Sequence, residues 1–502
     1  MQILSFWFLV IINLVLFFFL IKKPSTLLIF SGLIFNYLWR FTNVFYLATS
    51  SVPVHSEQMG RDIFGMAPSI SYFTINALYL FIIISCWSNL STRLVNSHNE
   101  YNTRLDERIY SCFNTCIFFG LSFVVLYAFF ELFINDVIPI RDCLERTIFN
   151  STYHGLFHSF IIEHASMYSF VMGCLAFYPC FKEKKIVQNR YLFLSSLFIV
   201  YGLITSNRFS FFLKLFLAFF APMAIAIIYS KKDSFFKIIR ETYVVKTVAL
   251  YSLIVGGTII VGLGNSYFRV RGICEINNKN FQAKLADKKN EIFQVDTTGK
   301  LEINNLNKVE NKLSARLLVQ QGEMWWPVYE RLDSPHDIKG ALHFMFVEPF
   351  TKERNTGIQF LMYKTLGSDR ARAVVVDHGQ TYIVNQFDVI VETFGLYIGT
   401  FLILVSGVLF VGVLYLLMHS YFQGHFLSVM SGVYVLYGLQ LLSFSGMINF
   451  FQPWTFWIKT GTFLFFLKFE KIIYKHESVQ RGFDLFSNVQ NKLMKSFGRK
   501  FF

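Results

Sequence analysis

The sequence predicts an all-α polytopic membrane protein, from its composition, its many apolar segments and the position of one long polar insert. Hydrophobic residues make up 54% of the 502 residues, and charged residues only 16%. A soluble domain carries about 25% charged residues. About eleven segments approach the ~20 apolar residues that a helix needs to cross a bilayer. The polar insert, Gly264–Phe387, lies between the eighth and ninth of these segments.

The predicted spans follow one another closely on both sides of the insert. They cover residues 3–21, 26–48, 69–90, 111–134, 156–180, 191–206, 209–229, 246–263, 388–417, 425–447 and 450–469. We therefore expect four parts: eight spans within 1–263, a loop domain at 264–387, three spans within 388–469 and a tail at 470–502.

Basic residues set the expected orientation of these spans. Lysines and arginines follow spans one, three, five, seven and eleven, as Lys22, Lys23, Arg93, Arg104, Arg108, Lys182, Lys184, Lys185, Arg190, Lys231, Lys232, Lys237, Arg240, Lys468, Lys471 and Lys475. Such residues gather on the cytoplasmic side. We therefore expect an outer N-terminus, a cytoplasmic C-terminus and an outward-facing insert. The first segment lacks a basic leader and a small-residue cleavage site, so it is expected to be retained.

The formal net charge of +14 comes mostly from these cytoplasmic residues and the tail, and it does not indicate a nucleic-acid partner. Residues Phe483–Phe497 form a basic amphipathic pattern in the tail. Such a segment is typical of a helix that lies on an anionic inner leaflet. An ordered cytoplasmic end to the chain is the alternative.

Arginines stand at two points where spans reach the outer surface. Arg208 closes the short turn Thr205-Ser-Asn-Arg208 between spans six and seven, and Arg269 and Arg271 follow span eight. A guanidinium at the hydrocarbon boundary is costly without a partner. Its fork matches phosphate oxygens in a bidentate manner. The pattern favours a phosphate site, with snorkelling to lipid headgroups as the alternative.

Residues Ser314–Leu332 predict an amphipathic helix within the insert, bent at Pro327. One face carries Leu318, Gln321, Trp325, Val328 and Leu332, and the other carries Arg316, Gln320 and Glu323. The paired Trp325 and Trp326 suit anchoring at a membrane interface, where Trp is enriched. A platform on which sugars stack is the alternative.

A few ionisable residues lie inside or beside the predicted spans. Arg40 and Glu131 are candidates for an outward-facing cavity, and Lys459 is a candidate partner for one of the acidic side chains. His154 and His158 have the i, i+4 spacing that can bind a metal. A polar contact between helices is the favoured interpretation of this pair, because no matching ligand pair stands out elsewhere.

The chain resembles the O-antigen polymerases of the Wzy type and the related O-antigen ligases. The resemblance rests on the shared architecture and on three local matches: the turn ending at Arg208, the Arg269-x-Arg271 pair, and Asp377-His378-Gly379 followed by Glu392-Thr-Phe-Gly395. The sequence departs from the ligase-like pattern, since Gly379 follows His378 and one extra residue separates Glu392 from Gly395.

The resemblance implies a GT-C-like fold in the bacterial inner membrane and a role in lipopolysaccharide biosynthesis. A glycan on undecaprenyl diphosphate would be transferred, with inversion at the periplasmic face, to a second lipid-linked repeat unit. Possible protein partners are a chain-length regulator and a flippase. An O-antigen ligase, or a flippase or exporter that is not an enzyme, is the alternative.

Roles for individual residues follow from the same resemblance and from their types. The diphosphate would bind Arg208, Arg269, Arg271 and Arg316, and the sugars would contact Gln320, Gln321, Trp325 and Trp326. His378 or Glu323 would accept the hydroxyl proton as general base. The sequence contains no Asp-x-Asp motif. We therefore expect arginines to neutralise the leaving group without a metal or other cofactor.

The orientation can be tested with reporter fusions. A reporter fused after Lys185 should give a cytoplasmic signal, and one fused after Lys300 a periplasmic signal, because basic residues remain on the cytoplasmic side. The reverse pair of signals would refute the predicted topology.

Overall fold

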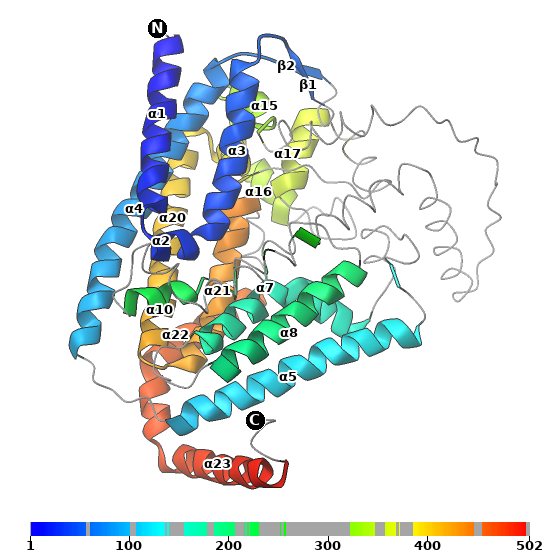
Figure 1. Cartoon of the computed structure of the whole chain (residues 1–502). Coiled ribbons are helices and arrows are strands. Elements are labelled where there is room, and N and C mark those ends of the chain that lie inside the picture. Colours follow the sequence, from blue (N-terminus) through cyan, green and yellow to red (C-terminus); the bar gives the residue numbers. More distant parts are fainter. Residues whose placement is uncertain are drawn as a thin grey trace, which may run out of the picture. The chain divides into compact units, whose positions relative to one another are not determined.

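The computed structural model describes most of the helical parts of the chain. The described residues are 2–56, 61–100, 107–135, 138–139, 155–177, 185–205, 215, 218–219, 221–229, 252, 256–257, 322–346, 357–367, 371, 385–445 and 454–497. They form helices almost throughout (Figure 1). The chain divides into two compact units, one formed by Met1–Asn102 and Glu310–Glu470, the other by Thr103–Val309 and Lys471–Phe502.

The first part of unit 1 contains four helices and a small hairpin. The helices are α1 (Gln2–Ile21), α2 (Pro24–Ile29), α3 (Ser31–Thr49) and α4 (Ala67–Glu100). Strands β1 (Val54–Ser56) and β2 (Arg61–Ile63) pair antiparallel between α3 and α4. This hairpin was not expected from the apolar pattern, since each strand has only three residues.

The second part of unit 1 begins with three short helices and ends with longer ones. The short ones are α15 (Trp325–Glu330), α16 (Ile338–Phe346) and α17 (Gly357–Leu366), followed by α19 (Gln386–Phe394), α20 (Leu396–Phe422), α21 (Phe426–Ser445) and α22 (Trp454–Lys475). The residues from the predicted polar insert thus pack in the same unit as the N-terminal helices.

Helix α4 holds unit 1 together by packing against α1, α3, α15 and α20. Gly407 lets α20 approach closely, because a Cβ there would lie 2.8 Å from the Tyr79 ring. A buried polar link joins three of the helices: Tyr37 donates to Asn13 Oδ1 at 2.5 Å, and Asn13 donates to the Phe73 carbonyl oxygen at 3.0 Å. The polar link fixes α1 and α3 against α4, and the close approach at Gly407 fixes α20 against it.

Unit 2 contains α5 (Glu107–Ile134), α7 (Leu156–Ala176), α8 (Lys185–Ile204), α10 (Met223–Tyr229) and α23 (Glu477–Phe497). Helices α5, α7 and α8 pack against one another, and α23 packs against α5. Gly173 of α7 lies against the backbone of Phe219, with no room for a Cβ.

Four of the described helices are long and apolar enough to cross a membrane: Gln2–Ile21, Ala67–Leu94, Ile109–Ile134 and Leu396–Phe422. They are compatible with an all-α, multi-pass membrane protein, whereas the count of eleven spans stays a prediction. Two of the predicted spans each correspond to two separate helices in the structure. The 26–48 span breaks at Phe30, and the 388–417 span breaks at Gly395. Residues 209–214, 216–217 and 220 of the 209–229 span lie outside the described residues, as does most of 246–263.

A buried carboxylate caps the N-terminus of α21. Glu470 of α22 accepts hydrogen bonds from the Leu427 and Ser428 amides at 2.8 Å each, and from the Ser428 hydroxyl at 2.5 Å. These amides belong to the first turn of α21, which has no acceptor of its own there. The negative charge also complements the positive end of the helix dipole.

Replacing Glu470 with Ala should therefore destabilise the protein by about 2–4 kcal/mol, because charge-assisted hydrogen bonds to buried amides are lost. The measurement is thermal unfolding of the purified protein in detergent. The matched control is Glu477→Ala, since Glu477 is exposed and pairs only with the exposed Arg481 in the described structure. An equal effect of the two variants would contradict the assigned role of Glu470.

Candidate functional site

A set of charged and aromatic side chains surrounds α15, which comes from the C-terminal part of the predicted insert. Trp325 is fully buried, and its indole donates to the Pro68 carbonyl oxygen at 2.6 Å at the start of α4. Its ring also meets Tyr72 edge to face, with centroids 5.7 Å apart. The indole thus fixes α15 on the first turns of α4.

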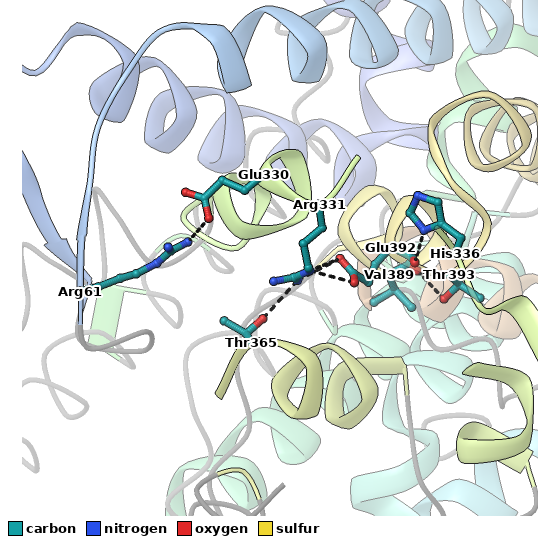
Figure 2. Close-up of polar contacts among 8 residues, drawn as sticks. All are labelled: Arg61, Glu330, Arg331, His336, Thr365, Val389, Glu392 and Thr393. Carbon is teal, nitrogen blue, oxygen red and sulfur yellow. Dashed lines mark hydrogen bonds and ion pairs between the residues drawn. The ribbon is translucent and has the colours of Figure 1, made fainter. Parts of the chain in front are cut away.

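Two adjacent residues at the end of α15 form ion pairs with different elements. Arg331 contacts the carboxylate of Glu392 in α19 through Nε, at 3.0 and 3.1 Å, and through Nη2 at 2.9 Å (Figure 2). Glu330 pairs with Arg61 of β2 at 2.6 Å. The Glu392 side chain is only 5% exposed, whereas Arg61 and Glu330 are about half exposed. The Arg331–Glu392 pair is therefore the stronger anchor.

His336 reinforces this contact at the break between α19 and α20. Its Nδ1 donates to the Glu392 carbonyl oxygen at 3.0 Å. Gly395 ends α19 with φ +79°, and a Cβ there would lie 3.0 Å from the His336 ring. Only glycine fits both the conformation and the space. The segment Glu392–Gly395 thus provides an ion pair and a helix break side by side.

A second group of polar residues lies buried between α3, α4 and α19. Asn385 and Asp388 form a reciprocal cap at the start of α19, each side chain accepting from the other's backbone N–H at 2.9 Å. Asn385 also lies 3.4 Å from the Tyr72 hydroxyl. The guanidinium of Arg40 in α3 is close enough to Tyr72 and Asp388 to interact electrostatically. Arg40 and Asp388 are both buried.

Glu323 lies in the turn before α15, and this turn packs against α3. The preceding residue, Gly322, contacts Asn43 and Val44 of α3, and a Cβ at Gly322 would lie 2.9 Å from Val44. Asn43 and Val44 are about one helical turn from Arg40. Glu323 itself is fully buried. Three buried carboxylates, those of Glu323, Asp388 and Glu392, thus lie in unit 1 around α15 and α19.

Of the sequence-predicted site residues, the structure describes Glu323, Trp325 and Trp326. Trp325 and Trp326 are both buried in this conformation, and the sugar-stacking role stays a prediction. Pro327 lies in the first turn of α15, where its missing N–H costs no helical hydrogen bond. The other predicted residues lie outside the described part: Arg208, Arg269, Arg271, Arg316, Gln320, Gln321 and His378.

The remaining ionisable residues inside spans have specific contacts in the structure. Glu131 lies 3.4–3.5 Å from the Phe157 and His158 amides in the first turn of α7. The His158 ring bonds the Tyr201 hydroxyl at 2.9 Å, which is the polar contact favoured from the sequence. Lys459 lies 3.5 Å from the centroid of the Tyr434 ring, so its described contact is a cation–π interaction.

The described residues contain no group of three or more His, Cys, Asp or Glu side chains able to hold a metal. The polar set around α15 consists of Arg40, Tyr72, Glu323, Arg331, Asp388 and Glu392. It combines carboxylates, guanidiniums and a phenol. Carboxylates can accept a proton, and guanidiniums can bind an anionic oxygen. Ionisable residues within membrane helices are commonly part of a functional site.

The sequence contained one readable signal for this set. Asn385 and Asp388 have the spacing of a capping box, with an acceptor at the N-cap and another at the third helical position. It predicts a helix start at Gln386, whereas the predicted span begins at 388. Arg331 and His336 carry no comparable signal, because their partners lie some 60 residues away along the chain.

Comparison with known proteins finds a match to a family model. Residues 351–458 match the model of a family of unknown function, DUF6418. The match covers α17, α19, α20, α21 and the beginning of α22. No curated protein and no solved structure matches the chain.

Breaking the Arg331–Glu392 pair should destabilise the protein more than breaking Arg61–Glu330. We expect Arg331→Ala to cost about 2–3 kcal/mol, since the buried Glu392 loses its counter-ion. Arg61→Ala should cost about 0–1 kcal/mol, because that pair is largely exposed. Thermal unfolding of the single and double variants in detergent gives the coupling energy of each pair. Equal coupling energies would contradict the ranking.

Proposed function

We propose that this protein is an O-antigen polymerase, a glycosyltransferase that joins repeat units carried on undecaprenyl diphosphate at the outer face of the membrane. The observation that supports the proposal best is the buried polar set around α15. Charged side chains among apolar helices are costly, and they are commonly retained for substrate or proton pathways. The region 310–387 of the predicted insert contributes Glu323 and Arg331 to this set.

The position of the set is consistent with catalysis at the outer face. Within unit 1, β1, β2 and α15 lie toward the same end as the N-terminus (Figure 1). This is the outer end in the orientation that the basic residues predict. A lipid-linked donor has its diphosphate at headgroup depth, so a site near that end of the helices would meet it.

In the proposed reaction, a hydroxyl of the acceptor sugar attacks the anomeric carbon of the donor. The new C–O bond forms as the bond to the diphosphate oxygen breaks, and the diphosphate leaves with the electron pair. A base takes the hydroxyl proton. Glu323 or His378 would serve as that base. Arg208, Arg269, Arg271 and Arg316 would neutralise the leaving diphosphate, as preorganised cations do for developing charge.

Arg208 carries the sharpest prediction of this proposal. In a deletion strain, Arg208→Ala should abolish long glycan chains, because a charge-assisted hydrogen bond of about 1.5–3 kcal/mol is lost. That loss corresponds to roughly 10- to 150-fold in rate. Arg208→Lys should rescue only partly, since it keeps the charge without the bidentate fork. The readout is a gel of the surface lipopolysaccharide, with protein level in the membrane measured in parallel.

The same gel separates the competing functions. Deletion of a polymerase leaves lipid A core with a single repeat unit, whereas deletion of a ligase or a flippase leaves bare core. In the same assay Glu323→Gln should shorten the glycan chains if Glu323 is the base, whereas the matched control Glu330→Gln should not, because Glu330 is about half exposed and Glu323 is fully buried. Normal chain lengths from Arg208→Ala at native expression would remove Arg208 from the site. Bare core in the deletion strain would overturn the polymerase proposal.

A further inference from the structure

Helix α23 has an apolar face that its contacts with the protein leave partly open. Leu485 is 67% exposed and Val489 is 55% exposed. They are four residues apart, so they lie one above the other on the same face. On the neighbouring part of the helix, Phe483 and Phe486 are half-buried, and the Phe483 ring contacts Tyr474 at 6.1 Å between centroids. The helix is therefore held to its unit on one side and exposes aliphatic side chains on the other.

Basic residues border this open face. At 100° per residue, Lys492 lies about 20° from Leu485 around the helix axis, and Arg481 about 40° on the same side. The Lys492 and Arg481 side chains are both exposed. Glu477 and Asp484 lie farther around the helix, on the polar side. Long cationic side chains beside an apolar face can extend to lipid headgroups while the apolar face enters the acyl boundary.

The chain around α23 is strongly cationic. From Lys471 to Phe502, seven lysines and arginines stand against two acidic residues. A second copy of the same helix would bring like charges together, whereas an anionic bilayer surface is complementary. The charge balance therefore favours lipid over self-association as the occupant of the open face.

The connection to α22 puts α23 directly after the end of the predicted last span. α22 ends at Lys475 and α23 begins at Glu477, so a single residue, His476, separates them. The turn is fixed by hydrogen bonds, since the His476 amide donates to the Ile473 carbonyl oxygen and the Gln480 side chain donates to that of Tyr474. α22 contains the predicted last span, and its end still exposes Ile472.

We propose that α23 binds the anionic phospholipid surface of the leaflet at which α22 ends, through the Leu485–Val489 face and the flanking Arg481 and Lys492. The helix thus acts as a surface anchor that distinguishes anionic from zwitterionic lipid. The inference does not depend on the proposed glycosyl transfer, because it rests only on contacts, exposure and charge in and around α23.

The test uses the full-length protein in lipid nanodiscs made of phosphatidylcholine, with or without phosphatidylglycerol. Hydrogen exchange of residues 477–497, followed by mass spectrometry, reports how well the helix is protected. Wild-type protein should exchange several-fold more slowly in the anionic discs, and high salt should remove the difference because it screens surface charge. Equal exchange in the two kinds of disc would overturn the proposal.

Variants separate the two parts of the surface. Lys492→Glu should reduce the anionic-lipid effect about fivefold or more, since each basic residue near an anionic surface contributes about that factor. Lys339→Glu is the matched control, with the same charge change at an exposed lysine in α16. Leu485→Ser with Val489→Ser should raise exchange in both discs, whereas Asn488→Ser, at an exposed polar position, should not. If residues 477–497 are protected from exchange only in discs that contain two copies of the protein, the exposed face binds a second copy. That result would contradict the lipid proposal.

Discussion

Amide groups at the start of a helix need an acceptor, and in apolar surroundings water does not supply one. This constraint fixes several of the described contacts. The carboxylate of Glu470 meets the first turn of α21, Asn385 and Asp388 cap α19, and Glu131 lies beside the first turn of α7. In each case, a side chain that is costly to bury also stabilises a helix start. The placement of α19 matters most, because it positions Glu392.

The buried carboxylates therefore do not all have the same significance for function. The buried Glu470 and the half-buried Glu131 have backbone amides as partners, which accounts for their positions by structure alone. Glu392 has a guanidinium partner, and Asp388 combines a cap with a nearby Arg40. Glu323 is fully buried in the turn before α15, where its carbonyl oxygen accepts the Trp326 N–H at 3.2 Å.

Sequence reasoning predicted the helical class and most helix positions, since long apolar runs depend only on local composition. It placed the first span at 3–21, and the structure has α1 at Gln2–Ile21. It did not detect the breaks at Phe30 and Gly395, because apolar residues continue on both sides. It could not pair Arg331 with Glu392 or Trp325 with Pro68, since long-range contacts depend on tertiary packing. The spacing of Asn385 and Asp388 is that of a capping box, and it could have predicted the start of α19 from the sequence.

The family match covers only part of the arrangement around α15 and α19. Glu392 and Gly395 lie within the matched residues 351–458, whereas their contacts, Arg331 and His336, lie before them. A conformational change at α15 would therefore act on α19 through Glu392, and on the hairpin through Arg61. Because Glu330 and Arg331 are adjacent, α15 cannot shift far without straining one pair or the other. Of the two pairs, Arg61–Glu330 is exposed and weaker, so a shift of α15 would break that pair before Arg331–Glu392.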